Sequence, residues 1–333
     1  MTSKKSLAAS LLSLSTGLLL TLSAAGGATA SPRTPQEPDG PRIVSATVAS
    51  LTAASYWTSE RMRSAIPGDV LAEKAAARQI NKGKSLDGIT DRGSSTKIAG
   101  TSGGTKTTTL HTNEKPVSHI GKVFFTLNGA NYVCSGSSVA AENKSTVSTA
   151  GHCLNAGPGA FATNFIFVPA YKDGAAPYGR WPAMKLFAPQ EWTAVGNMQY
   201  DTGFAVVARV GGRSLADAVG AVGVAFSQPR GLTYKAFGYP AARPFTGQRL
   251  VSCYGKAGTD PISPKFETQG IPCDMTGGSS GGPWLLQDGT ATQVGYQNSV
   301  NSYGYGSRST TMYGPYWGET IRQVYTIASR TAA

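Results

Sequence analysis

The 333-residue sequence contains only three histidines and four cysteines, and charged residues make up only 14% of it. The cysteines form no Cys-x-x-Cys pair, and no pair of neighbouring histidines accompanies them. Structural zinc sites usually show one of these spacings. The sequence therefore gives no support for a metal site, and we expect neither a metal nor another cofactor.

All four cysteines lie beyond residue 130, and a chain with an even number of cysteines in an oxidising compartment usually forms disulfides. Their spacing favours Cys134 with Cys153 and Cys253 with Cys273, although four cysteines permit three connectivities. Each of these two short loop closures would contribute about 3 kcal/mol in the chain-entropy model.

Long apolar runs are missing beyond the first 30 residues. Before that point, Lys4 and Lys5 precede an uncharged apolar run from Leu7 to Leu22, and Ala28-Thr29-Ala30 follows. This order is typical of a secretory signal peptide over residues 1–30. We expect a secreted, extracellular protein that does not contact a membrane; a retained N-terminal anchor is the alternative.

The net charge of +12 is shared equally between residues 1–111 and 112–333. Neither half contains a dense basic run with interleaved aromatic residues, which nucleic-acid-binding segments usually show. We therefore expect no nucleic-acid partner.

Residues 31–111 differ in character from the rest. A proline-rich start leads into an alanine-rich segment that favours helix, and residues 93–109 are almost all Gly, Ser, Thr and Lys. The latter composition is typical of a flexible linker. We interpret residues 31–111 as a pro-segment and linker, and 112–333 as the mature domain. A second binding module of about 80 residues without disulfides would be only marginally stable.

The remaining residues predict an all-β domain. Short apolar runs such as NFIFVPAY, TGFAVVARV and LTYKAFGY are bounded by Gly, Pro, Asn or Asp, as strands usually are. Asn128-Gly129 between two such runs predicts a tight hairpin. The only good helix candidate spans residues 318–329. About 220 residues of this kind fit one large all-β unit or a pair of small barrels.

Two adjacent serines, Ser279 and Ser280, stand among four glycines in TGGSSGGP. A serine nucleophile needs an imidazole base, and His152 in STAGHC is the strongest candidate because a neighbouring cysteine would hold it rigidly. His111 and His119 are interpreted as ordinary polar residues.

A buried carboxylate should orient the imidazole. We favour Asp201, because it directly precedes an apolar strand; Asp173 and Asp217 are the competitors. With Ser280 as nucleophile, the amide groups of Gly278 and Ser280 would bind the oxyanion.

Gly278 to Gly282 also fits the G-x-S-x-G elbow of α/β-hydrolases. That fold places its Asp and His after the serine, and no histidine follows His152 here. The order His152, Asp201, Ser280 instead corresponds to the chymotrypsin type.

STAGHC and GSSGGP resemble the histidine and serine motifs of chymotrypsin-like serine endopeptidases. DMTGGSSGGP is closer still to the bacterial secreted branch that includes glutamyl endopeptidases. The resemblance extends from about Lys115 to the C terminus. It implies two six-stranded antiparallel β-barrels, with the catalytic residues between them, and cleavage of protein or peptide substrates through an acyl-enzyme.

The resemblance also gives candidates for the substrate pocket. Asp274 stands where trypsin-like enzymes bind Lys or Arg, Thr276 could line the pocket, and Gln297 falls near the place where glutamyl endopeptidases carry a histidine. The motif has Ser279 where trypsin-like zymogens carry an activating Asp. We therefore interpret Arg42-Ile43-Val44 as a coincidental likeness to an activation site. Control would come from the pro-segment as inhibitor or folding aid, removed by a cut between residues 100 and 116.

Two alternatives use the same residues: a secreted esterase with the same triad, and a catalytically inactive protease-like binding protein. The presence of all three triad residues argues against the second. We expect a monomer.

Overall fold

The computed structural model describes residues 42–86, 110–287, 295–306 and 308–333. They belong to one compact unit. The expected signal peptide (1–30) and the linker (93–109) lie outside the described residues. We call residues 42–86 the leader and residues 110–333 the body.

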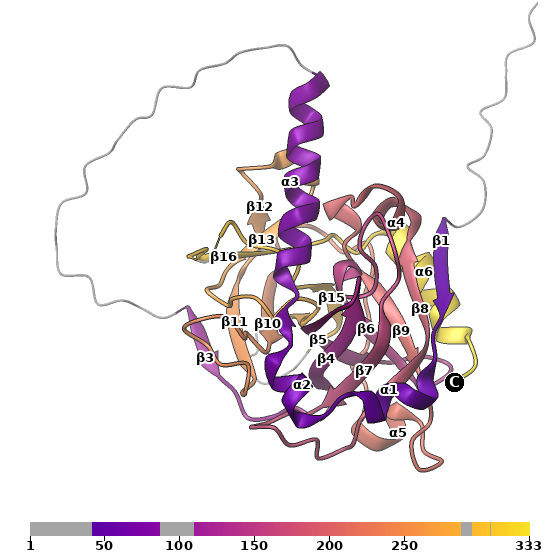
Figure 1. The fold of residues 1–333 in the computed structure, drawn as a ribbon. Coiled ribbons are helices and arrows are strands. Elements are labelled where there is room, and N and C mark those ends of the chain that lie inside the picture. Colours follow the sequence, from indigo (N-terminus) through magenta and orange to yellow (C-terminus); the bar gives the residue numbers. More distant parts are fainter. Residues whose placement is uncertain (1–41, 87–109, 288–294, 307) are drawn as a thin grey trace, which may run out of the picture. The chain divides into compact units, whose positions relative to one another are not determined.

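Six antiparallel strands in the first half of the body close into a barrel (Figure 1). The pairing order is β8-β7-β4-β5-β6-β9, and β9 then returns to β8. These strands are β4 (Ile120–Leu127), β5 (Ala130–Val139), β6 (Thr146–Thr149), β7 (Thr163–Pro169), β8 (Trp181–Pro189) and β9 (Gly203–Val207). Closure gives each of the six strands two neighbours, although parts of β8 and β5 extend beyond these pairings and keep a free edge.

The expected hairpin joins β4 to β5. Asn128 and Gly129 have φ values of 50° and 80°, as a two-residue turn with two left-handed positions requires. The strand-like runs named above fall on β7, β9 and β10, so apolar runs bounded by turn residues located these strands well.

The second half of the body, together with β3 from its beginning, forms two sheets. One has the order β15-β14-β10-β11-β3 and the other β12-β13-β16. Their strands are β3 (His111–Asn113), β10 (Thr233–Gly238), β11 (Val251–Lys256), β12 (Gly258–Thr259), β13 (Gln269–Pro272), β14 (Pro283–Leu286), β15 (Gln297–Val300) and β16 (Thr311–Gly314). The hydrogen bonds of this half are thus divided between two sheets, whereas the first barrel closes. Strand β3 pairs with β11 from His111 on, so it crosses the expected boundary between residues 111 and 112.

Helices are few in the body, as expected. The terminal helix α6 (Glu319–Arg330) packs against β8 and β9 and buries Ile321 and Val324. The other helices are short: α4 (Gln190–Val195), α5 (Leu215–Val219), and the single 3₁₀ turns η1 (Gly151–Cys153), η2 (Met198–Tyr200) and η3 (Pro264–Phe266). Both expected disulfides, Cys134–Cys153 and Cys253–Cys273, are present.

The leader is built onto the barrel. It consists of β1 (Ile43–Thr47), α1 (Ser50–Tyr56), α2 (Ser59–Ser64), β2 (Ile66–Pro67) and α3 (Asp69–Leu86). Strand β1 pairs antiparallel with β8, and β2 pairs parallel with β5. The apolar Ile43-Val44 pair therefore begins a strand on the body.

Trp57 is the principal anchor of the leader. Its side chain is fully buried, its ring lies 5.3 Å from the ring of Phe124, and its indole N–H donates to the Asn164 carbonyl at 2.6 Å. A buried tryptophan with a satisfied N–H is among the strongest packing contacts that a segment can make. No helix in the described ranges has the length and apolar character that crossing a membrane would require.

Candidate active site

His152 and Asp201 lie on neighbouring turns that two paired strands bring together. His152 is in η1, after β6, and Asp201 directly precedes β9; Thr149 of β6 is opposite Gly203 of β9. The His152 Nδ1 atom lies 2.7 Å from Asp201 Oδ2, and the His152 backbone N–H donates to Asp201 Oδ1 at 2.8 Å. Both side chains are completely buried. The carboxylate therefore fixes His152 through both its ring and its backbone.

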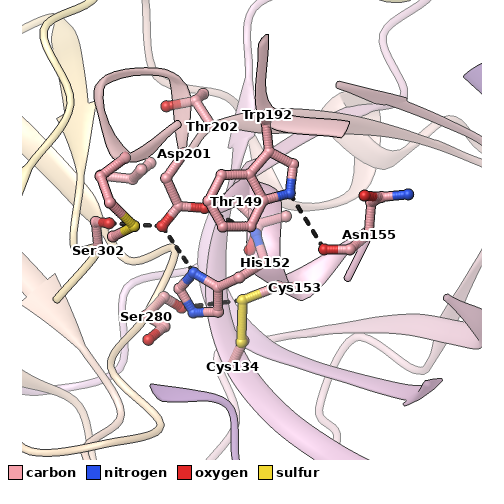
Figure 2. A network of polar contacts seen from close by, with 12 residues as sticks. Cys134, Thr149, His152, Cys153, Asn155, Trp192, Asp201, Thr202, Ser280 and Ser302 are labelled. Carbon is pink, nitrogen blue, oxygen red and sulfur yellow. Dashed lines mark hydrogen bonds and ion pairs between the residues drawn. A yellow bond between two sulfur atoms is a disulfide. The ribbon is translucent and has the colours of Figure 1, made fainter. Parts of the chain in front are cut away.

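A third donor completes the surroundings of the carboxylate. Ser302 Oγ donates to Asp201 Oδ2 at 2.5 Å, and the Trp192 ring lies 6.3 Å from the imidazole (Figure 2). Sequence reasoning missed Ser302, because a serine just after a short strand carries no signal of its own. The competing carboxylates are far less constrained: Asp173 and Asp217 are exposed and pair with Arg249 and Lys144.

Ser280 lies in the loop between β13 and β14, which the body holds closely. The Ser280 carbonyl accepts from the Ser135 N–H of β5 at 2.7 Å. Gly278 and Gly281 have φ values of +94° and +81°, which residues other than glycine adopt only at an energetic cost. A Cβ on Gly281 would also approach Thr149 Oγ1 to 2.1 Å. Glycine is thus required here by both backbone conformation and space.

Within the described residues, the second imidazole nitrogen, Nε2 of His152, is buried and has no hydrogen-bond partner. Figure 2 shows the imidazole between the Asp201 carboxylate and Ser280. Among the described residues, the N–H groups of Gly278 and Ser280 donate to no protein acceptor either. Within the described part of the chain, the β13–β14 loop thus carries a serine hydroxyl and two unengaged amide donors, and η1 contributes an unpartnered imidazole nitrogen.

A cavity opens beside Ser280, and the three expected pocket residues fall differently around it. Thr276 lines it. Asp274 does not: both of its carboxylate oxygens lie 2.8–2.9 Å from His111 Nδ1, on β3. Gln297 is fully buried in β15, where its side chain bonds to Ser148 and Ser299. Contrary to our expectation, neither Asp274 nor Gln297 lines this cavity, because each side chain has its hydrogen-bond partners elsewhere.

The leader reaches the same cavity. Asp69 and Glu73 of α3 line it together with Ser280. A Cβ on Gly277 would lie 2.0 Å from Asp69 Oδ1, so this carboxylate rests directly on the loop that carries Ser280. Burial raises the pKa of the Asp69 carboxyl, the Glu73 carboxylate raises it further, and nearby His152 lowers it. Sequence reasoning missed these contacts, because nothing local in an amphipathic helix marks where it docks.

Cys134, His152 and Cys153 lie close enough together to suggest metal ligands. The two sulfurs are bonded to each other, however, and a disulfide lacks the thiolate that binds a metal. The Cys134–Cys153 disulfide instead links the residue after His152 covalently to β5.

Solved structures resemble this chain closely. The crystal structure of protease Anisep from Arthrobacter nicotinovorans is 64% identical, with a TM-score of 0.65, and the match covers 67% of this chain and all of that one. The thermostable serine protease AL20 from an extremophilic microorganism is 52% identical, with a TM-score of 0.61, and the match covers 64% of this chain and 98% of that one.

A Glu endopeptidase is 19% identical, with a TM-score of 0.52 over 68% of this chain and 99% of that one, which supports the fold alone. No protein-family model and no curated protein matches the chain.

Proposed function

Because the chain belongs to the chymotrypsin-like serine proteases, in the branch represented by bacterial enzymes, it is a serine endopeptidase, and we propose that His152, Asp201 and Ser280 are its catalytic triad. The observation that carries the assignment is the fully buried His152–Asp201 pair, whose Nε2 atom is left without a partner on the side of Ser280. A general base needs this combination of a fixed ring and a free nitrogen.

The geometry supports the following course of reaction. Ser280 Oγ attacks the carbonyl carbon of the scissile peptide bond and its proton passes to His152 Nε2. The C–N bond then breaks, the imidazolium gives this proton to the leaving amine, and an acyl-enzyme remains. Water attacks the ester carbonyl with His152 again as base. The bond to Ser280 Oγ then breaks, the imidazolium returns its proton to this oxygen, and the carboxylic acid product leaves. Asp201 stays ionised and stabilises the imidazolium.

The Gly278 and Ser280 amides are the proposed oxyanion donors. Neither is engaged within the described protein, so both can bind the oxygen that becomes negative. One such donor lowers the barrier by about 3 kcal/mol in comparable sites. The left-handed conformation of Gly278 orients its N–H group in the loop.

Replacement of Ser280 tests the assignment. We expect Ser280→Ala to lower kcat for a protein substrate at least about 10⁴-fold, while the thermal unfolding midpoint stays unchanged. Ser279→Ala is the matched control. Its hydroxyl donates to the Thr276 carbonyl, so this variant should keep substantial turnover. Loss of turnover in Ser279→Ala but not in Ser280→Ala would reverse the roles of the two serines.

We further propose that the chain is a secreted, monomeric precursor with a signal peptide (1–30), a pro-segment and linker (31–111) and a protease domain (112–333). Two disulfides in the body support export to an oxidising compartment. The pro-segment acts as an inhibitor. In support, His152 is completely buried and Ser280 only 3% exposed while the leader is seated, and Asp69 and Glu73 line the cavity beside Ser280.

The same contacts suit a folding aid. Strands β1 and β2 pair with β8 and β5, so the leader could hold two barrel strands before the barrel closes. Inhibition has a direct readout. A serine-directed covalent reagent should label Ser280 much more slowly in the full chain than in the enzyme freed of its leader, and equal rates would contradict inhibition.

A further inference from the structure

The cavity beside Ser280 is lined mainly by uncharged side chains. Its only charged side chains, among the described residues, are those of Asp69 and Glu73, which belong to the leader. The body contributes uncharged side chains alone. Once the leader has gone, no ionised side chain of the described lining remains to meet a substrate.

The polar side chains of the body in this lining are also already engaged. Every hydroxyl except that of Ser280 donates to a protein oxygen. The bonds are Thr276 to the Ala242 carbonyl (2.7 Å), Ser279 to the Thr276 carbonyl (2.8 Å), Ser302 to Asp201 (2.5 Å), Ser309 to the Thr311 carbonyl (2.7 Å) and Tyr303 to Asp260 (2.6 Å). What these side chains can offer a substrate is therefore mainly their carbon atoms.

Two methionines and an aromatic ring supply the rest of the surface. Met275 and Met312 are only 5% and 6% exposed, and both line the cavity. Tyr303 presents its ring there, because its hydroxyl is bound to Asp260 and Thr268. Thioether and aromatic groups adapt well to apolar side chains of differing shape.

The groups that would select a charged side chain lie outside the lining. Asp274 is bound to His111 through both carboxylate oxygens. Arg243 follows Ala242 in the chain, and Arg308 precedes Ser309. Both arginines are exposed and line another hollow. The pKa of Asp69 is raised, mainly by burial, and no Lys or Arg of the described lining offsets this.

We propose that this cavity receives the side chain that precedes the scissile bond and selects an uncharged, apolar one, such as Leu, Met or Phe. The proposal rests on the proposed triad, because it places the pocket beside Ser280. A lysine, arginine or glutamate in this pocket would lose its water without gaining a partner of opposite charge, which strongly disfavours binding. An apolar side chain gains from the same transfer.

The test is the cleavage preference of the enzyme freed of its leader. We would use peptides that differ only in the residue before the scissile bond, and a denatured protein mixture whose new termini are read by mass spectrometry. We expect kcat/KM for Leu, Met or Phe to exceed that for Lys, Arg or Glu by about 100-fold or more. Asp274→Asn should leave this order unchanged, because Asp274 does not line the cavity.

Three outcomes would overturn the proposal. Preferred cuts after Lys or Arg that disappear in Asp274→Asn would make Asp274 the pocket acid. Preferred cuts after Glu would show that a cation reaches the cavity. Equal cleavage after all residues would show that the cavity does not select. In each case Ser280→Ala would still be inactive, whereas equal activity of Ser280→Ala and the native enzyme would instead reject the proposed triad.

Discussion

Different interactions stabilise the leader and the body. The body has a closed barrel and two disulfides, so its strand pairing does not depend on the leader strands. The leader, residues 42–86, contains no cysteine and adds only short strands to the edges of the body's sheets. Apart from the continuous backbone, only noncovalent contacts hold the leader, so our proposal that it is removed requires no disulfide to be broken.

Within the leader, attachment and obstruction fall on different residues. Trp57 is fully buried against the barrel and contributes packing. Asp69, half-buried over Gly277, brings a carboxyl group into the cavity, where burial raises its pKa. The leader thus combines a favourable packing contact at Trp57 with an unfavourable burial at Asp69.

The largest expected effect lies in the body. Asp201→Asn should lower kcat of the leader-free enzyme about 10⁴-fold, because the amide favours the wrong imidazole tautomer. Seating of the leader should not change, since none of its described residues bonds to Asp201. Peptide hydrolysis by the leader-free enzyme measures the effect on kcat, and the thermal midpoint of the full chain measures the seating of the leader. A lower kcat together with a lower midpoint would show that leader and triad are coupled.

The next effect lies in the leader anchor. Trp57→Ala removes a buried tryptophan, worth about 3–5 kcal/mol in comparable sites. We therefore expect labelling of Ser280 by a serine-directed reagent in the full chain to accelerate by about two to three and a half orders of magnitude.

Tyr56→Phe provides the matched control for that experiment. It loses only the hydroxyl bond to Asn131, about 1 kcal/mol, and should accelerate labelling about tenfold at most. If Trp57→Ala labelled no faster than the native chain, with an unchanged circular dichroism spectrum, the anchor would lie elsewhere.

A smaller effect should follow from Ser302→Ala in the body. This change removes one hydrogen bond to an ionised carboxylate, worth about 1.5–3 kcal/mol, so kcat/KM should fall about 10–100-fold. The measurement is a pH–rate profile of the leader-free enzyme. Loss of a purely structural contact would change the thermal midpoint and leave the profile unmoved, whereas a positioning role predicts a shift in the profile.

The smallest effect concerns pH and the leader. The pKa of Asp69 is raised when the leader is seated, mainly by burial and also by Glu73, while His152 acts in the opposite direction. Seating thus takes up a proton. It should be tightest below the usual Asp range, near pH 4, and should weaken as the pH rises through the raised value.

Labelling of the full chain, divided by that of the leader-free enzyme at each pH, should therefore increase with pH. Asp69→Asn should flatten this ratio, because the titrating group is gone. A ratio that fell with pH in the native chain would mean that attraction between Asp69 and His152 outweighs burial.

Several features could be read from the sequence because they depend on neighbours in the chain. Asn128-Gly129 located a hairpin since only certain residues accept two left-handed positions in a row. The terminal helix and both disulfides followed in the same way from local pattern and spacing. The scarcity of histidine singled out His152, and the apolar strand after Asp201 predicted its burial.

Other features were decided only by the folded chain. Ser302 donates to Asp201 across 101 residues, Asp274 turns to His111 across 163, and Asp69 reaches the loop that carries Ser280. Local sequence cannot specify such contacts, since they depend on which strands become neighbours and on where each side chain then finds a partner. The sequence by itself determined the chemical groups of the site and their order; the tertiary structure decided which of them face the substrate, which are bound elsewhere, and what covers them.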